Sequence, residues 1–226
     1  MKRKTRAKYD EQWKNQDERA AAERRKWLSA VADPLLSMVN PITDRVVVDL
    51  GIGTGTLAFR AIELSQPKRM IGIDFSEMGL CVARGISRNQ RFKDVDVELV
   101  RADLEHIPLA NRSVDVVLSQ ATINLLPNKC VALREIARVA RSGSRIAISD
   151  AFRTSKAEDG ESWEQCIAGS ITVSEFSTHA LNAGLIIAGQ IDLTQQVKAL
   201  VKAKKWDWPE FLESNMDYRG FLLLRS

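Results

Sequence analysis

The chain has 226 residues, of which 45% are hydrophobic and 27% are charged, so it is long enough to bury a core within one domain. Its 12 glycines, 6 prolines and 3 cysteines exclude the collagen-like, low-complexity and disulfide-scaffold classes. The net charge of +4 is local, because residues 1–27 hold ten basic and five acidic side chains; this excludes a wholly basic nucleic-acid-binding domain and leaves a basic arm.

The first forty residues are predicted to form this basic arm and two helices. Residues 1–8 are expected to be a frayed tail, and a helix is predicted over residues 9–32. Four apolar side chains recur there at helical spacing among charges: Trp13, Ala20, Trp27 and Val31. Asp33 suits the N-cap and Pro34 the first turn of a second, short helix that ends at Val39.

Beyond this region, short apolar segments alternate with segments that have one apolar face. Strands are predicted at residues 46–50, 70–73, 97–100, 114–118 and 145–149. Helices are predicted at residues 56–64, 76–84 and 129–140. The alternation predicts β–α units that build a parallel sheet, and strands this apolar are typical of a sheet covered on both faces.

The pattern weakens after residue 150. A helix is predicted over residues 173–183, with Gly184 as its C-cap. Two final strands are predicted at residues 185–191 and 219–224.

The segment between these two strands is long for a hairpin loop, which predicts an insertion. A helix is expected over residues 195–205, followed by a turn that contains Trp206 and Trp208 and closes at Pro209. Four lysines make the insertion basic: Lys198, Lys202, Lys204 and Lys205. We therefore divide the chain into an arm and lid, residues 1–40, and a main domain, residues 41–226, with an insertion at about residues 195–217.

The strongest motif is a glycine-rich loop that follows the strand at residues 46–50. Three glycines at alternate positions let the backbone take positive φ and let a ligand approach it and the next helix N-terminus: Gly51, Gly53 and Gly55. Thr56 excludes both a phosphate-binding P-loop and the dinucleotide fingerprint. With Asp49 in front, the pattern Asp-x-Gly-x-Gly-x-Gly resembles motif I of the class I S-adenosylmethionine (SAM)-dependent methyltransferases. A tight turn without a ligand is the alternative.

Two more acids support this resemblance. Asp74 ends the second strand, where an acid can accept both hydroxyls of a ribose or cap the next helix. Asp103 follows the third strand, where the resembled family has an acid that accepts the adenine amino group; an ordinary loop acid is the alternative. Acids at the ends of successive parallel strands share one sheet edge, where doubly wound sheets bind ligands.

The resemblance implies SAM as cofactor and S-adenosylhomocysteine (SAH) as product. It also implies a Rossmann-like, doubly wound α/β fold: a seven-stranded, mainly parallel sheet with helices on both faces, a helical N-terminal lid and an insertion between the last two strands. The cofactor-binding residues it implies are Tyr9, Asp49, Gly51, Gly53, Gly55, Asp74, Phe75, Met78, Asp103, Leu104, Ser119 and Gln120.

Within that class, the chain is similar to the methyltransferase type 11 group of ubiquinone and menaquinone C-methyltransferases, through residues 103–117. Residues 118–125, 134–150 and 163–171 look most like arsenite methyltransferases, and the last of these segments carries Cys166.

The cysteines depart from the arsenite methyltransferases. That family has a cysteine where this chain has Ala121, and an N-terminal cysteine pair that this chain lacks before Cys81. Because several soft thiolates bind arsenic(III) together, a diverged enzyme with another small-molecule acceptor is the favoured hypothesis. Cys81 and Cys130 are expected to be buried on helices.

Methyl transfer from a sulfonium is a displacement in which the protein mainly positions the nucleophile and excludes water. Asp150 is a candidate base or orienting group, or a turn cap. Asn124 is a candidate for the acceptor pocket, or a cap of the next turn. Cys166 is a candidate substrate contact, or a core thiol.

Two other functions stay open from the sequence. An RNA or protein methyltransferase would use the basic arm and the segment from Lys198 to Trp208, where lysines and tryptophans suit phosphates and stacked bases. The sequence Ser119-Gln-Ala-Thr stands where many amino-methylating nucleic-acid enzymes have an Asn/Asp-Pro-Pro-Tyr/Phe tetrapeptide, which weighs against that chemistry. A non-catalytic SAM-binding module is the third hypothesis.

We expect the protein to be cytoplasmic and to be a monomer or a homodimer. No run of 18 apolar residues predicts a membrane span, and the N-terminus has no apolar signal segment. An odd number of cysteines favours free thiols. His106 and His179 lack metal-ligand spacing, so we predict no metal site.

Overall fold

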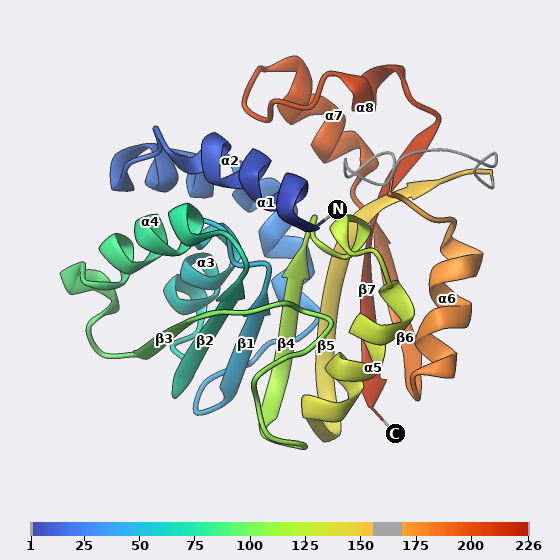
Figure 1. The fold of residues 1–226 in the computed structure, drawn as a ribbon, viewed down its shortest axis with the longest axis horizontal. Coiled ribbons are helices and arrows are strands. Elements are labelled where there is room, and N and C mark those ends of the chain that lie inside the picture. The colour runs from blue at the N-terminus through green and yellow to red at the C-terminus, as the bar shows by residue number, and fades with distance from the viewer. Residues whose placement is uncertain (1, 156–168, 226) are drawn as a thin grey trace.

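The computed structural model describes residues 2–155 and 169–225. Strands and helices alternate along most of the described chain (Figure 1). The strands are β1 Val46–Leu50, β2 Arg69–Asp74, β3 Asp96–Arg101, β4 Val114–Gln120, β5 Ala140–Arg153, β6 Leu185–Asp192 and β7 Met216–Arg225. The helices are α1 Lys2–Trp13, α2 Glu18–Ser37, α3 Thr56–Leu64, α4 Glu77–Ser87, α5 Lys129–Val139, α6 Val173–Asn182, α7 Thr194–Lys202 and α8 Glu210–Glu213, with short 3₁₀ turns η1 Gln90–Phe92 and η2 Ile123–Leu125.

The strands form a seven-stranded sheet in the order β3-β2-β1-β4-β5-β7-β6. β1 to β5 pair in parallel, and β7 lies antiparallel to both β5 and β6. This confirms the predicted Rossmann-like class. The strand order reverses between β1 and β4, and the crevice at the carboxyl ends beside such a reversal is where ligands of doubly wound sheets bind.

Helices cover both faces of the sheet because successive strand side chains point to opposite sides. In β1, Val47 packs into a core shared with α2, α3 and α4, whereas Val48 packs into a second core with α5 and α6. Both valines are fully buried, which is why the strand is apolar at every position except Asp49.

The N-terminal segment differs from the sequence prediction in two ways. Helix α1 begins at Lys2 instead of fraying to residue 8, and it presents Thr5 and Trp13 to the interior. The helix predicted over residues 9–32 is interrupted at residues 14–17, and α2 then runs through Pro34 to Ser37, where a helix end at residue 32 and a second, short helix were expected. Burial of the adjacent Leu35 and Leu36 offsets the missing backbone donor of the proline.

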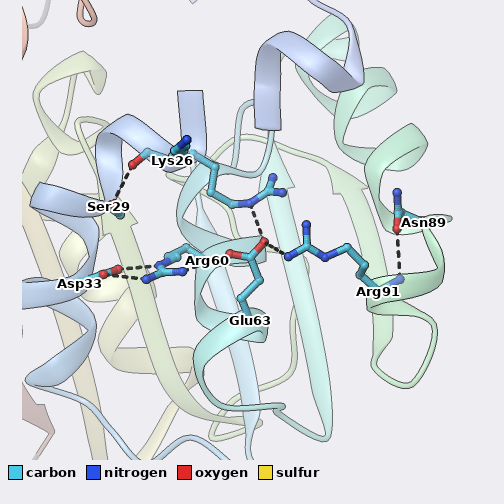
Figure 2. A network of polar contacts seen from close by, with 8 residues as sticks. Lys26, Ser29, Asp33, Arg60, Glu63, Asn89 and Arg91 are labelled. Carbon is cyan, nitrogen blue, oxygen red and sulfur yellow. Dashed lines mark hydrogen bonds and ion pairs between the residues drawn. The ribbon is translucent and has the colours of Figure 1, made fainter. Parts of the chain in front are cut away.

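A polar network holds α2 on α3 (Figure 2). The guanidinium of Arg60 donates to both carboxylate oxygens of Asp33, each at 2.7 Å. Glu63 accepts from Arg25 at 3.0 Å and from Arg60 at 3.3 Å, and lies 3.5 Å from the guanidinium of Arg91. A planar pair with two hydrogen bonds, such as Arg60 with Asp33, fixes the orientation of both side chains. The network therefore holds α2 in a fixed position on α3.

The predicted insertion is present between β6 and β7. It consists of α7, a turn with Trp206 and Trp208, and the short helix α8. The tryptophan rings pack on Phe211 and Tyr218, in a third apolar core that also contains Val31 of α2. As a result, the N-terminal helices and the insertion both lie over the end of the sheet where the parallel strands finish (Figure 1).

Candidate active site

A cavity of about 1050 Å³ lies at this edge of the sheet. Its floor comes from the loop after β1 and from the carboxyl ends of β2, β3 and β4, and its roof from α1, α2 and the Trp206–Glu210 turn. Segments that are nearly two hundred residues apart in the chain therefore enclose one space.

The glycine loop of the floor has the backbone that its sequence predicts. The φ angles of Gly51, Gly53 and Gly55 are 78°, 52° and 85°. A Cβ at position 51 would also lie 2.1 Å from Oγ1 of Thr122, so this position accepts only glycine. The N–H of Gly51 donates to the Ile73 carbonyl at 2.8 Å, which fixes the loop to the end of β2.

Two buried carboxylates face the cavity beside this loop. Burial and the neighbouring Asp74 raise the pKa of Asp49 to about 7, although the N–H of Ala58 donates to it at 3.1 Å. Burial likewise raises the pKa of Asp74, which accepts from the N–H groups of Gly53 at 2.7 Å and Ser76 at 2.8 Å. Ionised carboxylates are costly in such a site, and a cationic ligand would offset that cost.

Nine of the residues predicted to bind the cofactor line the cavity: Tyr9, Asp49, Gly51, Gly53, Asp74, Phe75, Asp103, Leu104 and Gln120. They come from α1 and from the ends of successive strands, as the pattern of acids predicted. Among them, Gln120 has a buried side-chain nitrogen without a hydrogen-bond partner among the described residues.

Three residues predicted to bind the cofactor do not line the cavity. Gly55 is the left-handed N-cap of α3. The backbone N–H of Met78 donates to Asp10 at 3.3 Å, and the hydroxyl of Ser119 donates to the Leu50 carbonyl at 3.0 Å. These contacts position the loop and the strands around the site.

The predicted catalytic residues are not brought together in the cavity. Asn124 and Asp150 are both buried outside its lining and bind each other: the Asn124 side-chain amide donates to Asp150 at 2.9 Å and to the Ala151 carbonyl at 2.6 Å. The pair anchors η2 to β5, which is a positioning contact. Cys166 lies outside the described residues.

The expectation that Cys81 and Cys130 are buried is wrong. Cys81 is exposed on α4, and Cys130 is half-buried on α5 with its sulfur 2.9 Å from Nδ1 of His179. Neither thiol lines the cavity. Among the residues the structure describes, no group of three or more metal-binding side chains is found, and no helix is long and apolar enough to cross a membrane.

Helix α1 closes the cavity as a docked lid. The Asp10 carboxylate accepts from the Ser76 hydroxyl at 2.7 Å, which ties α1 to the N-terminus of α4. Tyr9 contacts Phe75 edge-on at 6.3 Å between ring centroids, and Trp13 lies directly over Gly53. The sequence predicted a contact for Tyr9 and an apolar helix position for Trp13 but did not single out Thr5, although these three residues recur every four positions on one helix face.

The insertion closes the other side of the roof. Trp206 and Trp208 line the cavity, and Nζ of the adjacent Lys205 lies 4.0 Å from the ring centroid of Trp27 on α2. This contact joins the two roof segments. The two basic segments, residues 1–27 and the insertion, whose relation the sequence left open, therefore touch through Trp27 and Lys205.

Comparison with known proteins agrees with this geometry. The family described as "Methyltransferase domain" matches residues 43–209. An arsenite methyltransferase of Halobacterium salinarum is 33% identical over 145 residues, which are 61% of this chain and 36% of that protein. A malonyl-[acyl-carrier protein] O-methyltransferase of Yersinia pestis is 33% identical over 134 residues, which are 59% of this chain and 46% of that protein. The chain thus spans less than half the length of these curated relatives.

A solved structure shares the fold over most of the chain. Geranyl diphosphate C-methyltransferase from Streptomyces coelicolor A3(2) superposes with a TM-score of 0.71 at 16% identity, covering 88% of this chain and 77% of that chain.

Proposed function

Because this chain belongs to the methyltransferase domain family, we propose that it transfers the methyl group of SAM to a small-molecule acceptor. The observation that carries the proposal is the joint arrangement of the glycine loop and the acids Asp49, Asp74 and Asp103 around one roofed cavity. The relatives support it as a class, since they are named as methyltransferases of arsenite, malonyl-[acyl-carrier protein] and demethylmenaquinone.

The residues of the cavity fit this cofactor. Asp49 and Asp74 are buried acids with raised pKa values, and SAM carries positive charge on its sulfur and its ammonium group. Asp74 stands at the end of β2, where its carboxylate can accept from ribose hydroxyls. The backbone N–H groups of Thr54, Thr56 and Leu57 donate no hydrogen bond to the described residues and suit a carboxylate at the N-terminus of α3.

Methyl transfer from SAM requires the protein mainly to position the cofactor and the acceptor. When bound, SAM supplies a methyl group on a positively charged sulfur: a lone pair of the acceptor forms the new bond as the carbon–sulfur bond breaks, and sulfur keeps that electron pair in SAH. The glycine loop and Asp74 orient the donor side, and the roof of α1 and the insertion excludes water. Trp13, Trp206 and Trp208 give the acceptor side an aromatic wall.

Arsenite itself fits this wall poorly. Among the described residues no cysteine lines the cavity, whereas arsenic(III) prefers several thiolates. Aromatic and aliphatic side chains instead suit an organic acceptor. The free thiols of Cys81 and Cys130 favour a reducing compartment, and we propose the cytoplasm.

The proposal is tested by cofactor binding and by a methyl-acceptor screen. Asp74→Ala is expected to weaken SAM binding in calorimetry by roughly tenfold or more, because it removes a charged hydrogen-bond acceptor from the site. Asp96→Ala is the matched control, since Asp96 is an exposed acid on the neighbouring strand β3. If SAM does not bind the parent chain, or binds both variants equally well, the cofactor assignment is wrong.

Tritiated-methyl SAM identifies the acceptor. The screen contains arsenite, quinone precursors, hydrophobic organic acids and total RNA, each incubated with the full chain. We expect label in an organic small molecule. Label in RNA or protein would support the alternative, in which the basic arm and insertion at the cavity mouth hold a macromolecule.

A further inference from the structure

Arg24 is a cation of the cavity wall that has no counter-ion among the described residues, and it is partly buried, unlike the exposed Lys8, which also lines the cavity. Arg24 of α2 lines the cavity and stacks its guanidinium over the Trp13 ring, 4.9 Å from the centroid. It has no hydrogen bond or ion pair with any residue in the described ranges 2–155 and 169–225. Burial lowers the pKa of Arg24, yet a guanidinium stays charged in proteins. The Arg24 side chain is only partly buried, so the cavity wall holds a positive charge that solvent reaches and that has no counter-ion among the described residues.

The other arginines near this site are already paired. Arg6 and Arg101 also line the cavity, and their guanidinium groups lie 3.4 Å from the carboxylates of Asp10 and Glu77, respectively. Arg25, the next residue on α2, points to the opposite side and pairs with Glu63. Arg24 therefore differs from these three arginines because its guanidinium has no hydrogen-bond or ion-pair partner among the described residues.

Two further polar atoms of the cavity lining, one in the roof and one in the floor, have no partner among the described residues. The hydroxyl of Thr5 on α1 and the side-chain nitrogen of Gln120 on β4 are buried without a hydrogen-bond partner among the described residues. Buried donors are almost always satisfied in folded proteins, so such atoms in a ligand cavity indicate a ligand with oxygen acceptors. Arg24, Thr5 and Gln120 come from three different elements, which makes a shared structural cause improbable.

The surroundings restrict what that ligand is. The donor side of the cavity is acidic and suits the positively charged cofactor. The carboxylate of that cofactor can accept from the free backbone N–H groups at the start of α3. The roof offers apolar and aromatic surface through Leu28, Trp206 and Trp208, beside the acids Glu11, Asp207 and Glu210, so Arg24 supplies the positive charge there that an anionic group needs. We infer that the methyl acceptor is an organic acid: an apolar or aromatic body packed against Trp206 and Trp208, with a carboxylate bound by Arg24.

This inference rests on the proposed function and is tested by binding, with SAH present. The probes are benzoate, 2-naphthoate and octanoate, each paired with its neutral amide, and calorimetry measures their dissociation constants. At least one acid is expected to bind the parent chain roughly tenfold more tightly than its amide, since a charged hydrogen-bond pair in a buried site contributes about that much. Arg24→Gln should abolish the preference, and Arg24→Lys should restore part of it.

Arg19→Gln is the matched control, because Arg19 is an exposed arginine on the same helix. It should leave the preference for the acid unchanged. Arg24→Gln should unfold within a few degrees of the parent chain, because it removes no hydrogen bond or ion pair of the described residues and loses only the contact with Trp13. Its affinity for SAH should also be unchanged.

Two results would overturn the inference. In one, no acid binds better than its amide although SAH binds the parent chain. In the other, Arg24→Gln weakens SAH binding itself, which would assign Arg24 to the carboxylate of the cofactor. Failure of the parent chain to bind SAH at all would instead reject the proposed function.

Discussion

The raised pKa of Asp49 predicts that cofactor binding depends on pH. Its pKa of about 7 means that the buried carboxyl is largely protonated and neutral at acidic pH, and ionised above neutrality. A cationic ligand prefers the ionised form, so binding below pH 7 must first remove a proton. We expect SAM to bind on the order of tenfold more weakly at pH 5.5 than at pH 7.5.

The control for this prediction is Asp49→Asn, which is neutral throughout that range. Its SAM affinity should be low and nearly independent of pH, and the parent chain should approach it as the pH falls. Calorimetry at both pH values measures this directly. Equal dissociation constants for the parent chain at pH 5.5 and 7.5 would contradict the role given to the raised pKa.

At the scale of single residues, the sequence predicted the acids of the site better than its cations. Asp49, Asp74 and Asp103 stand at strand ends, and the alternation of strands and helices is enough to place strand ends at one edge. Arg24 could not be singled out, because its role depends on which face of α2 covers the cavity. Asn124 and Asp150 lie close together as expected for the same edge, but they satisfy each other.

Among the elements, the glycine loop is the most tightly constrained. Gly51 and Gly143 have almost the same φ, 78° and 77°, but a Cβ on Gly51 would overlap the Thr122 side chain whereas a Cβ on Gly143 would meet no atom within 4 Å. Substitution by alanine at either position costs about 1 kcal/mol of backbone strain. Gly51→Ala must also displace Thr122.

Urea unfolding and SAM calorimetry on the two variants separate these effects. Gly143→Ala should lower the free energy of unfolding by about 1 kcal/mol and keep normal SAM binding. Gly51→Ala should lower it by about 2–4 kcal/mol and lose SAM binding. Equal losses of stability in the two variants, with binding retained in both, would show that the close approach to Thr122 does not constrain the loop.

Elements were predictable where local and tertiary preferences agree. Helix α3 spans the predicted residues 56–64, because glycines precede it and its apolar face is continuous. Strand β5 was predicted at residues 145–149 but extends over Ala140–Arg153. Its added residues 150–153 pair antiparallel with β7, a partner more than sixty residues away that no local pattern reveals, and Ala140 at its start pairs with Val114 of β4. Helix α2 passed through Pro34 for a similar reason, since core packing overrides the proline there.

At the scale of the whole molecule, the roof of the cavity joins the two ends of the chain. The charge total of +4 had concealed two basic segments, and they meet where Lys205 lies over the Trp27 ring. Val31 of α2 shares an apolar core with the insertion, so the contact has a packed base beneath it. The roof is therefore one structure made from two segments, and loosening the junction should alter the acceptor side of the cavity and spare the donor side.

Lys205→Ala tests this division. A cation–π contact at an exposed site contributes about 0.5–1 kcal/mol, so we expect amide hydrogen exchange in residues 203–213 to become about two- to fivefold faster, and SAM affinity to stay the same. Trp27→Leu should have the same effect, and the double variant should add nothing further, because one contact is lost in all three. Lys202→Ala is the control, as an exposed lysine at the end of α7. Additive effects of the two substitutions, or exchange in the insertion that responds equally to Lys202→Ala, would mean that the lysine and the tryptophan do not hold the two segments together.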